Sequence, residues 1–100
     1  VLDDPVEGAK KLATRVLATH IKDLKPVKGL DAREWYFFSS TPVGDGLVDN
    51  QKLAQILYDA DYKGFLAVET DSLHPDYENR EHWAVEQSVK RLKEIAASVK

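Results

Sequence analysis

The chain has 100 residues, a net charge of −3 and 43% hydrophobic residues, which is typical of one small globular domain. The acidic balance argues against binding to a nucleic-acid backbone or an anionic membrane surface, and no apolar stretch is long enough to cross a bilayer. The absence of cysteine excludes disulfides, thiol nucleophiles and thiolate metal sites. The first residues lack the features of a signal peptide, so a cytoplasmic location is expected, and the missing initiator methionine suggests a start inside a longer gene product.

The first predicted element is a helix from Asp4 to about Arg15. Asp4 can cap it, Pro5 suits its first position, and Glu7 can complete a capping box. Apolar residues follow at helical spacing: Val6, Ala9, Leu12 and Ala13. An almost wholly apolar strand is predicted next, from about Arg15 to Lys22, as expected when a parallel sheet is covered on both faces.

A long connection from Lys22 to Asp49 follows this strand. Connections of this length in compact domains are usually functional or disordered. The aromatic run at its centre (Trp35, Tyr36, Phe37 and Phe38) is predicted to form a short extended piece that packs in a core or interface rather than stacking on a sugar. The segment 44–46 reads as a turn, since no phosphate-loop pattern surrounds it.

A second helix is predicted to start at a cap, Asp49 or Asn50, and to run to about Ala60 with its apolar residues inward. Gly64 then serves as the stop signal before a second strand, 65–70. A loop over 71–77 leads into a last helix over about 78–99, with an apolar stripe of Val85, Val89, Leu92, Ile95, Ala96 and Val99. His74 in the loop and His82 on the helix are expected to face solvent.

The two predicted strands both end in a side chain that can bind a metal, His20 in the first and Glu69 in the second. Residues two apart share a strand face, so His20 lies on the face of Val16 and Ala18, and Glu69 on that of Phe65 and Ala67. If the strands are parallel neighbours, about 4.8 Å apart, the imidazole and the carboxylate reach the same space. Such a pair suits Mn²⁺, Mg²⁺, Co²⁺ or Zn²⁺, but it is only half of a usual ligand set.

The order strand, helix, strand predicts a βαβ unit with a right-handed crossover, and therefore an α/β domain over 1–100 with two parallel strands and three helices. Two strands seldom suffice for independent stability, and parallel sheets are normally larger. We therefore expect a part of a larger (β/α) architecture, or a chain that depends on assembly, with an apolar face exposed when it is alone.

Three segments resemble motifs of one family. The segment 17–23 (Leu-Ala-Thr-His-Ile-Lys-Asp) resembles the His-x-His-x-Lys-Asp strand ending of the xylose isomerase-like TIM-barrel superfamily, which includes sugar phosphate isomerases and epimerases. Segment 42–49 is similar to that family's Leu-Gly-Glu-Gly-x-Ile-Asp turn, and segment 62–69 to its Tyr-x-Gly-x-Leu-x-Val-Glu last strand. The resemblance spans about residues 4–98. It implies the C-terminal quarter of an incomplete (β/α)₈ TIM barrel, from the sixth helix to the eighth.

This resemblance implies one divalent cation, Mn²⁺ first among the candidates, held by two glutamates, an aspartate and a histidine on four strands. His20 corresponds to the histidine. Glu69 corresponds to the last glutamate, which in the epimerases also exchanges a proton with the substrate and is thus the implied catalytic residue. Lys22 and Asp23 are candidates for substrate binding, or alternatively an exposed ion pair of little energetic value.

Two positions depart from the family pattern. Ala18 replaces the first histidine of the pair, and Pro26 stands where some epimerases have an arginine. Lys25 or Lys28 is then the expected contact to a phosphate or hydroxyl of the substrate.

The implied function is a metal-dependent sugar or sugar phosphate isomerase or epimerase, which needs the rest of the barrel or self-association. The cation would stabilise an enediolate while a carboxylate moves a proton next to the carbonyl. Because the other two ligands lie on earlier strands, these 100 residues alone are expected to be inactive.

Three alternatives compete with this function. A lyase of the inosose dehydratase type would use the same chemistry with loss of a hydroxyl. A DNA-processing relative of endonuclease IV shares the barrel, but Lys22 precedes Asp23 where that family has asparagine, and the chain is acidic. In a non-catalytic α/β assembly module, His20 and Glu69 would be incidental.

Overall fold

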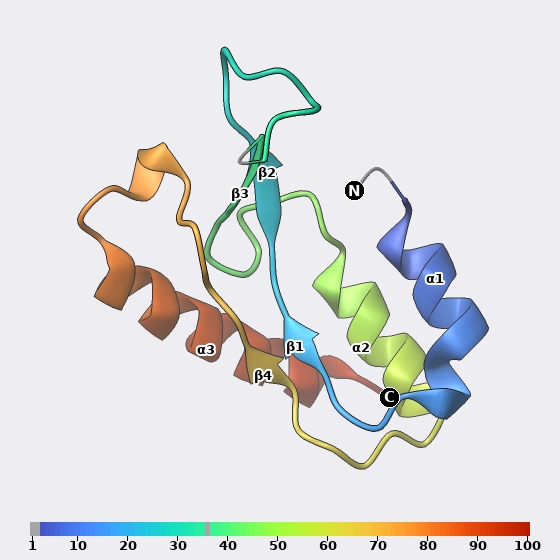
Figure 1. Cartoon of the computed structure of the whole chain (residues 1–100). Helices are drawn as coiled ribbons and strands as arrows, with labels where there is room; N and C mark the ends of the chain where they lie inside the picture. Colours follow the sequence, from blue (N-terminus) through green and yellow to red (C-terminus); the bar gives the residue numbers. More distant parts are fainter. Residues whose placement is uncertain (1–2, 36) are drawn as a thin grey trace.

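The computed structural model describes residues 3–35 and 37–100, which form a mixed α/β fold with three α-helices and two small sheets (Figure 1). The α-helices are α1 (Pro5–Leu12), α2 (Asn50–Asp59) and α3 (Glu81–Ser98), with short 3₁₀ helices η1 (Ala13–Arg15) and η2 (Pro75–Tyr77). The strands are β1 (His20–Ile21), β2 (Leu24–Pro26), β3 (Phe38–Ser40) and β4 (Ala67–Val68).

Strands β1 and β4 pair in parallel, with His20 opposite Ala67 and Ile21 opposite Val68. The predicted parallel pair is confirmed, but both strands are much shorter than the predicted ranges 15–22 and 65–70. In the described part of the chain the sheet has only these two strands, and its ladder pairs only His20–Ile21 with Ala67–Val68. Figure 1 shows α3 crossing behind these strands while α1 lies beside α2.

The long connection contains a second sheet that was not predicted, in which β2 and β3 pair antiparallel. Between them the loop closes through a hydrogen bond from the Val27 amide to the Phe37 carbonyl, 2.8 Å long. Phe37 and Phe38 are half-buried and meet edge to face, as a packed aromatic segment should. The prediction is wrong for Trp35, whose surface is 87% exposed on the loop, and Tyr36 lies outside the described residues.

The predicted helix starts are confirmed for the first two helices. Asp4 caps α1 by accepting from the Val6 and Glu7 amides, and Asp49 caps α2 by accepting from the Lys52 amide. No capping box forms, because the Glu7 carboxylate binds Lys10 instead.

The predicted end of α2 at about Ala60 is confirmed, but Gly64 is not the residue at which the chain turns away from the helix. The backbone turns at Asp61, with φ of 64°, before Gly64 is reached. Helix α3 begins at Glu81, since η2 and Asn79, with φ of 60°, precede it.

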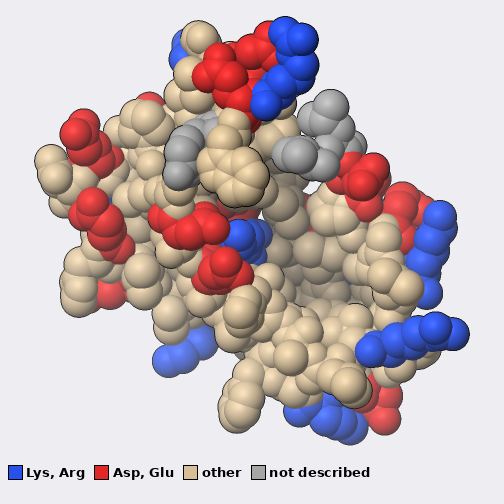
Figure 2. Space-filling view, in the orientation of Figure 1, with Lys and Arg blue, Asp and Glu red and all other residues tan. Residues whose placement is uncertain are grey.

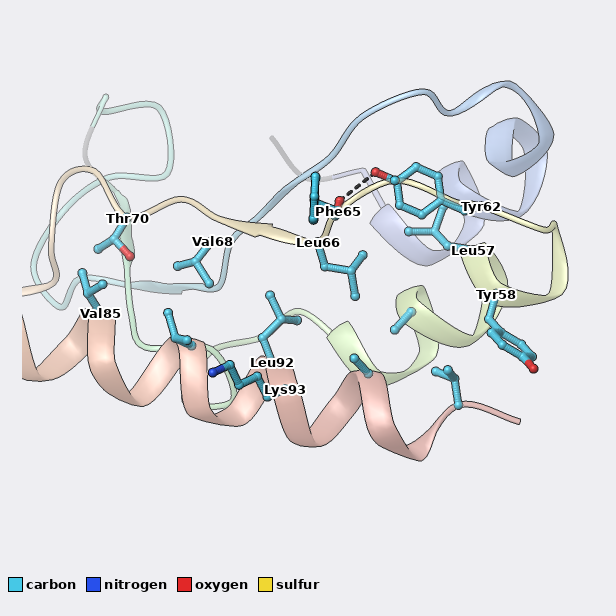
Figure 3. Close-up of a pocket in the computed structure, with 15 residues that line it drawn as sticks. Leu57, Tyr58, Tyr62, Phe65, Leu66, Val68, Thr70, Val85, Leu92 and Lys93 are labelled. Carbon is cyan, nitrogen blue, oxygen red and sulfur yellow. Dashed lines mark hydrogen bonds between the residues drawn. The ribbon is translucent and has the colours of Figure 1, made fainter.

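The core lies between α3 and the helix-facing side of the parallel pair. Ile21, Val43 and Leu92 form its centre, and Figure 3 shows Leu66 and Val68 directed from β4 toward α3. The residues before each strand, which we call the strand starts, are open to solvent: Leu17 is 92% exposed and Phe65 is 89% exposed. The chain therefore presents apolar surface, as expected for two strands without further neighbours. Among the described residues, no helix has the length and apolar character needed to span a membrane.

Candidate functional site

The side chains of His20 and Glu69 meet diagonally across the parallel pair, because His20 is the first residue of β1, opposite Ala67, and Glu69 directly follows β4. The ladder continues beyond β4 because the Glu69 amide donates to the Ile21 carbonyl at 2.9 Å. The imidazole Nδ1 of His20 then lies 2.7 Å from Oε2 of Glu69. The two side chains that the sequence predicted to converge do so.

Lys22 and Asp71 extend this arrangement on the same face of the strands. Each lies two residues beyond His20 or Glu69, which returns its side chain to their side. The Lys22 ammonium is 3.2 Å from Oε1 of Glu69 and 3.0 Å from Oδ2 of Asp71, and the Ser40 hydroxyl donates to Oδ1 of Asp71 at 2.7 Å. We call His20, Lys22, Ser40, Glu69 and Asp71 the rim cluster.

The charges of the rim cluster stabilise one another. The hydrogen bond to Asp71 raises the pKa of the Lys22 ammonium, partial burial opposes this, and Glu69 adds to it. The Ser40 hydroxyl, followed by Lys22, lowers the pKa of the Asp71 carboxyl. Figure 2 shows basic atoms flanked by acidic ones in the middle of this face. Lys22 is therefore charged and is shared by two carboxylates.

The donor set of His20 and Glu69 fits part of a metal site. Nδ1 of His20 and Oε2 of Glu69 are 2.7 Å apart, which is a hydrogen-bond distance, and imidazole nitrogen and carboxylate oxygen are both ligand types that divalent metals accept. Within 3–35 and 37–100, no three His, Asp or Glu side chains are placed to share one ion. The Lys22 ammonium joins Asp71 to Glu69.

Asp23, predicted at the substrate side, lies in the interior with 1% of its surface exposed. Its Oδ2 accepts from the amides of Gly44 and Gly46 at 2.9 and 3.0 Å, and its Oδ1 accepts from Val48 at 2.9 Å and from Leu24 at 3.0 Å. The carboxylate thus organises the turn that leads into α2. The alternative of an exposed Lys22–Asp23 ion pair is wrong, since Lys22 binds other carboxylates.

Lys25, the other predicted substrate contact, binds the loop before α3. Its ammonium lies 2.7 Å from Asp76 and 5.1 Å from the centre of the Tyr77 ring, so it ties β2 to η2. The hydrogen bond to Asp76 raises the pKa of Lys25.

The two other histidines differ in exposure. The His74 side chain is 7% exposed, so the prediction that it faces solvent is wrong: Nε2 lies 3.1 Å from the Pro26 carbonyl oxygen and Nδ1 accepts from the Asp76 amide. This imidazole fastens β2 to η2. His82 does face solvent, as predicted, and pairs with Glu86 at 2.8 Å.

An apolar hollow of about 770 Å³ lies on the opposite side of β4, between α2 and α3 (Figure 3). Leu57, Leu66, Val89 and Leu92 line it, together with the Lys93 side chain. The predicted stripe of α3 thus faces this hollow, while the helix buries Ala84, Ser88 and Leu92 at intervals of four.

Asp71 and Ser40 were not among the residues predicted from the sequence. The available signal was the spacing: Glu69-x-Asp71 repeats the two-residue interval of His20-x-Lys22, which places all four side chains on one face of a parallel pair. No such signal marks Ser40, because its contact depends on the unpredicted β2–β3 sheet.

Comparisons with protein-family models, with curated proteins and with solved structures found no match.

Proposed function

We propose that this chain supplies the histidine and the last glutamate of a divalent-metal site in a sugar isomerase or epimerase. The observation that supports this proposal most is the 2.7 Å contact between Nδ1 of His20, the first residue of β1, and Oε2 of Glu69, which directly follows the carboxyl end of β4. In enzymes built from parallel strands, substrates are bound at the carboxyl ends of the strands, which is where Glu69 lies. The remaining ligands would come from strands outside these 100 residues.

The two oxygens of Glu69 have different surroundings, which suits a carboxylate that transfers a proton. Oε1 is held by the Lys22 ammonium, and Oε2 points to His20. A bound divalent cation would stabilise negative charge that develops on the sugar oxygens. Glu69 would remove a proton from the carbon next to the carbonyl, and its return to the adjacent carbon gives isomerisation. A dehydratase of the inosose type would use the same carboxylate.

Removal of either ligand should weaken Mn²⁺ binding. We expect His20→Ala and Glu69→Gln to reduce the affinity for Mn²⁺ by at least about tenfold, since each deletes one of the two donors. Paramagnetic broadening of amide signals during a Mn²⁺ titration measures this, and it should centre on the ends of β1 and β4.

His82→Ala is the matched control, because His82 and Glu86 form a second histidine–glutamate pair of similar length on α3. Equal losses in His20→Ala and His82→Ala, or an unchanged affinity in both ligand variants, would exclude the proposed site.

The open strand starts support the proposal that the chain needs the rest of a barrel or a second copy. We expect the 11.3 kDa chain to sediment as an assembly larger than a monomer, and a Leu17→Lys/Phe65→Lys double variant to shift toward the monomer. Leu47→Lys is the control, because Leu47 is an exposed leucine away from the strand starts. A wild-type monomer over the whole concentration range would contradict self-association.

A further inference from the structure

We propose that the rim cluster takes an uncharged polyhydroxy or keto compound rather than a phosphorylated one, and that Asp71 sets this preference. The proposal rests on the function proposed above for the same site. The function proposed above does not distinguish free sugars from sugar phosphates, because both carry the hydroxyl and carbonyl oxygens that such a site binds.

The first step is the state of Lys22, the cation nearest the His20–Glu69 pair in the rim cluster. An ammonium has three N–H donors, and Lys22 directs two contacts to the carboxylates of Glu69 and Asp71. Its third donor remains for a neutral hydroxyl or carbonyl oxygen. Two carboxylates facing one ammonium give these three groups a net charge of −1, which disfavours a phosphate dianion.

The second step is the charge of the loop that follows β4. Segment 69–81 carries one arginine against five acidic residues: Glu69, Asp71, Asp76, Glu78 and Glu81. The neighbouring cation from β2, Lys25, is bound to Asp76 at 2.7 Å. In (β/α)₈ enzymes phosphate groups are commonly held by the loops after the last two strands. Here the corresponding loop repels anions and neutralises the lysines beside it.

The third step is the position of Asp71, which is held by Ser40 and contacts Lys22 without contacting His20 in the structure. Replacing it by asparagine keeps a side-chain oxygen for the Ser40 hydroxyl and removes one negative charge from Lys22. The Lys22 ammonium then has only Glu69 as a charged partner, so it is available to bind an anion.

The test is a titration with inorganic phosphate without metal, followed by the amide NMR signals around the rim cluster. We expect Asp71→Asn to bind phosphate about fivefold to tenfold more tightly than the wild type, as removal of one nearby unit charge at a protein surface allows. Asp76→Asn is the matched control: it makes the same change in net charge and frees Lys25 instead of Lys22. It should leave phosphate shifts at the rim at the wild-type level.

Adding Lys22→Ala to Asp71→Asn should abolish the gain, and Asp71→Ser replaces Asp71→Asn if the latter fails to fold. The proposal is overturned if the wild type binds phosphate at the rim as tightly as Asp71→Asn, if Asp76→Asn gains equally, or if the double variant keeps the gain. Because these titrations contain no metal, they are independent of the Mn²⁺ experiment. A Mn²⁺ affinity that His20→Ala and Glu69→Gln leave unchanged would remove the proposed function, whereas phosphate binding by the wild type would remove only this inference.

Discussion

Replacing Asp23 by alanine should lower the free energy of unfolding by about 3 kcal/mol or more, measured by urea denaturation followed by circular dichroism. The Asp23 carboxylate accepts hydrogen bonds from the backbone N–H groups of three residues in the 44–48 turn. Because the site is buried, water cannot take over these hydrogen bonds when the carboxylate is removed. Each donor left without a partner in the interior costs free energy, and the turn would lose its anchor to the segment between β1 and β2.

Asp31→Ala is the control for this substitution. Asp31 also accepts a backbone N–H, from Arg33, but it does so in an exposed turn where water takes over the contact. Equal destabilisation by the two substitutions would show that the buried hydrogen bonds of Asp23 are not what holds the turn.

Gly46→Ala should also destabilise the protein strongly, by about 2 to 4 kcal/mol. A Cβ at this position would meet the Leu24 carbonyl oxygen at 2.5 Å and would contact Oδ1 of Asp23. Both are fixed, one by the backbone and one by its hydrogen bonds, so the turn has to move. The midpoint of urea unfolding measures the loss.

Gly8→Ala provides a control with the opposite sign. Gly8 lies within α1 with nothing within 4 Å of an added Cβ, so alanine should stabilise the protein by about 0.5 to 1 kcal/mol. A Gly46→Ala variant as stable as the wild type would mean that the turn does not pack against Asp23 as described.

Local signals in the sequence predicted the parts of the fold that depend on neighbouring residues. Asp4 and Asp49 cap their helices because a short acceptor side chain before a helix satisfies its first amides wherever the helix lies. The meeting of His20 and Glu69 was also predictable, since it required only two-residue alternation and a parallel pair.

The errors arose where contacts between distant segments decide the structure. Residues 16–19 have strand-like sequence, yet a strand needs hydrogen-bonded neighbours, and in the described chain β1 pairs only at His20 and Ile21. The β2–β3 sheet was not predicted because a proline such as Pro26 is unfavourable in a strand. Pro26 is the last residue of the edge strand β2, where its missing N–H is tolerated.

The buried position of Asp23 could have been predicted from the alternation of side chains along a strand. His20 and Lys22 share the rim face, so Ile21 and Asp23 point to the other face, and both are buried. The resemblance to the family motif led us to predict Asp23 on the substrate side, because it directly follows Lys22 in that motif. A buried aspartate beside a Gly-Asp-Gly turn instead indicates an acceptor for backbone amides.

Ser40 joins the two small sheets into one hydrogen-bonded body. Its amide donates to the Ser72 carbonyl at 2.7 Å, its carbonyl accepts from the His74 amide at 2.8 Å, and it forms a parallel bridge with Leu73. Segment 70–73 is thus pinned at both ends, by Glu69 on β1 and by His74 on β3. A one-residue insertion before Asp71 would rotate its side chain to the opposite side of the chain, whereas residues 28–35 lie outside both ladders, so the loop there has room to change length. In relatives of this chain, differences in length should accumulate in the second segment and be rare in the first.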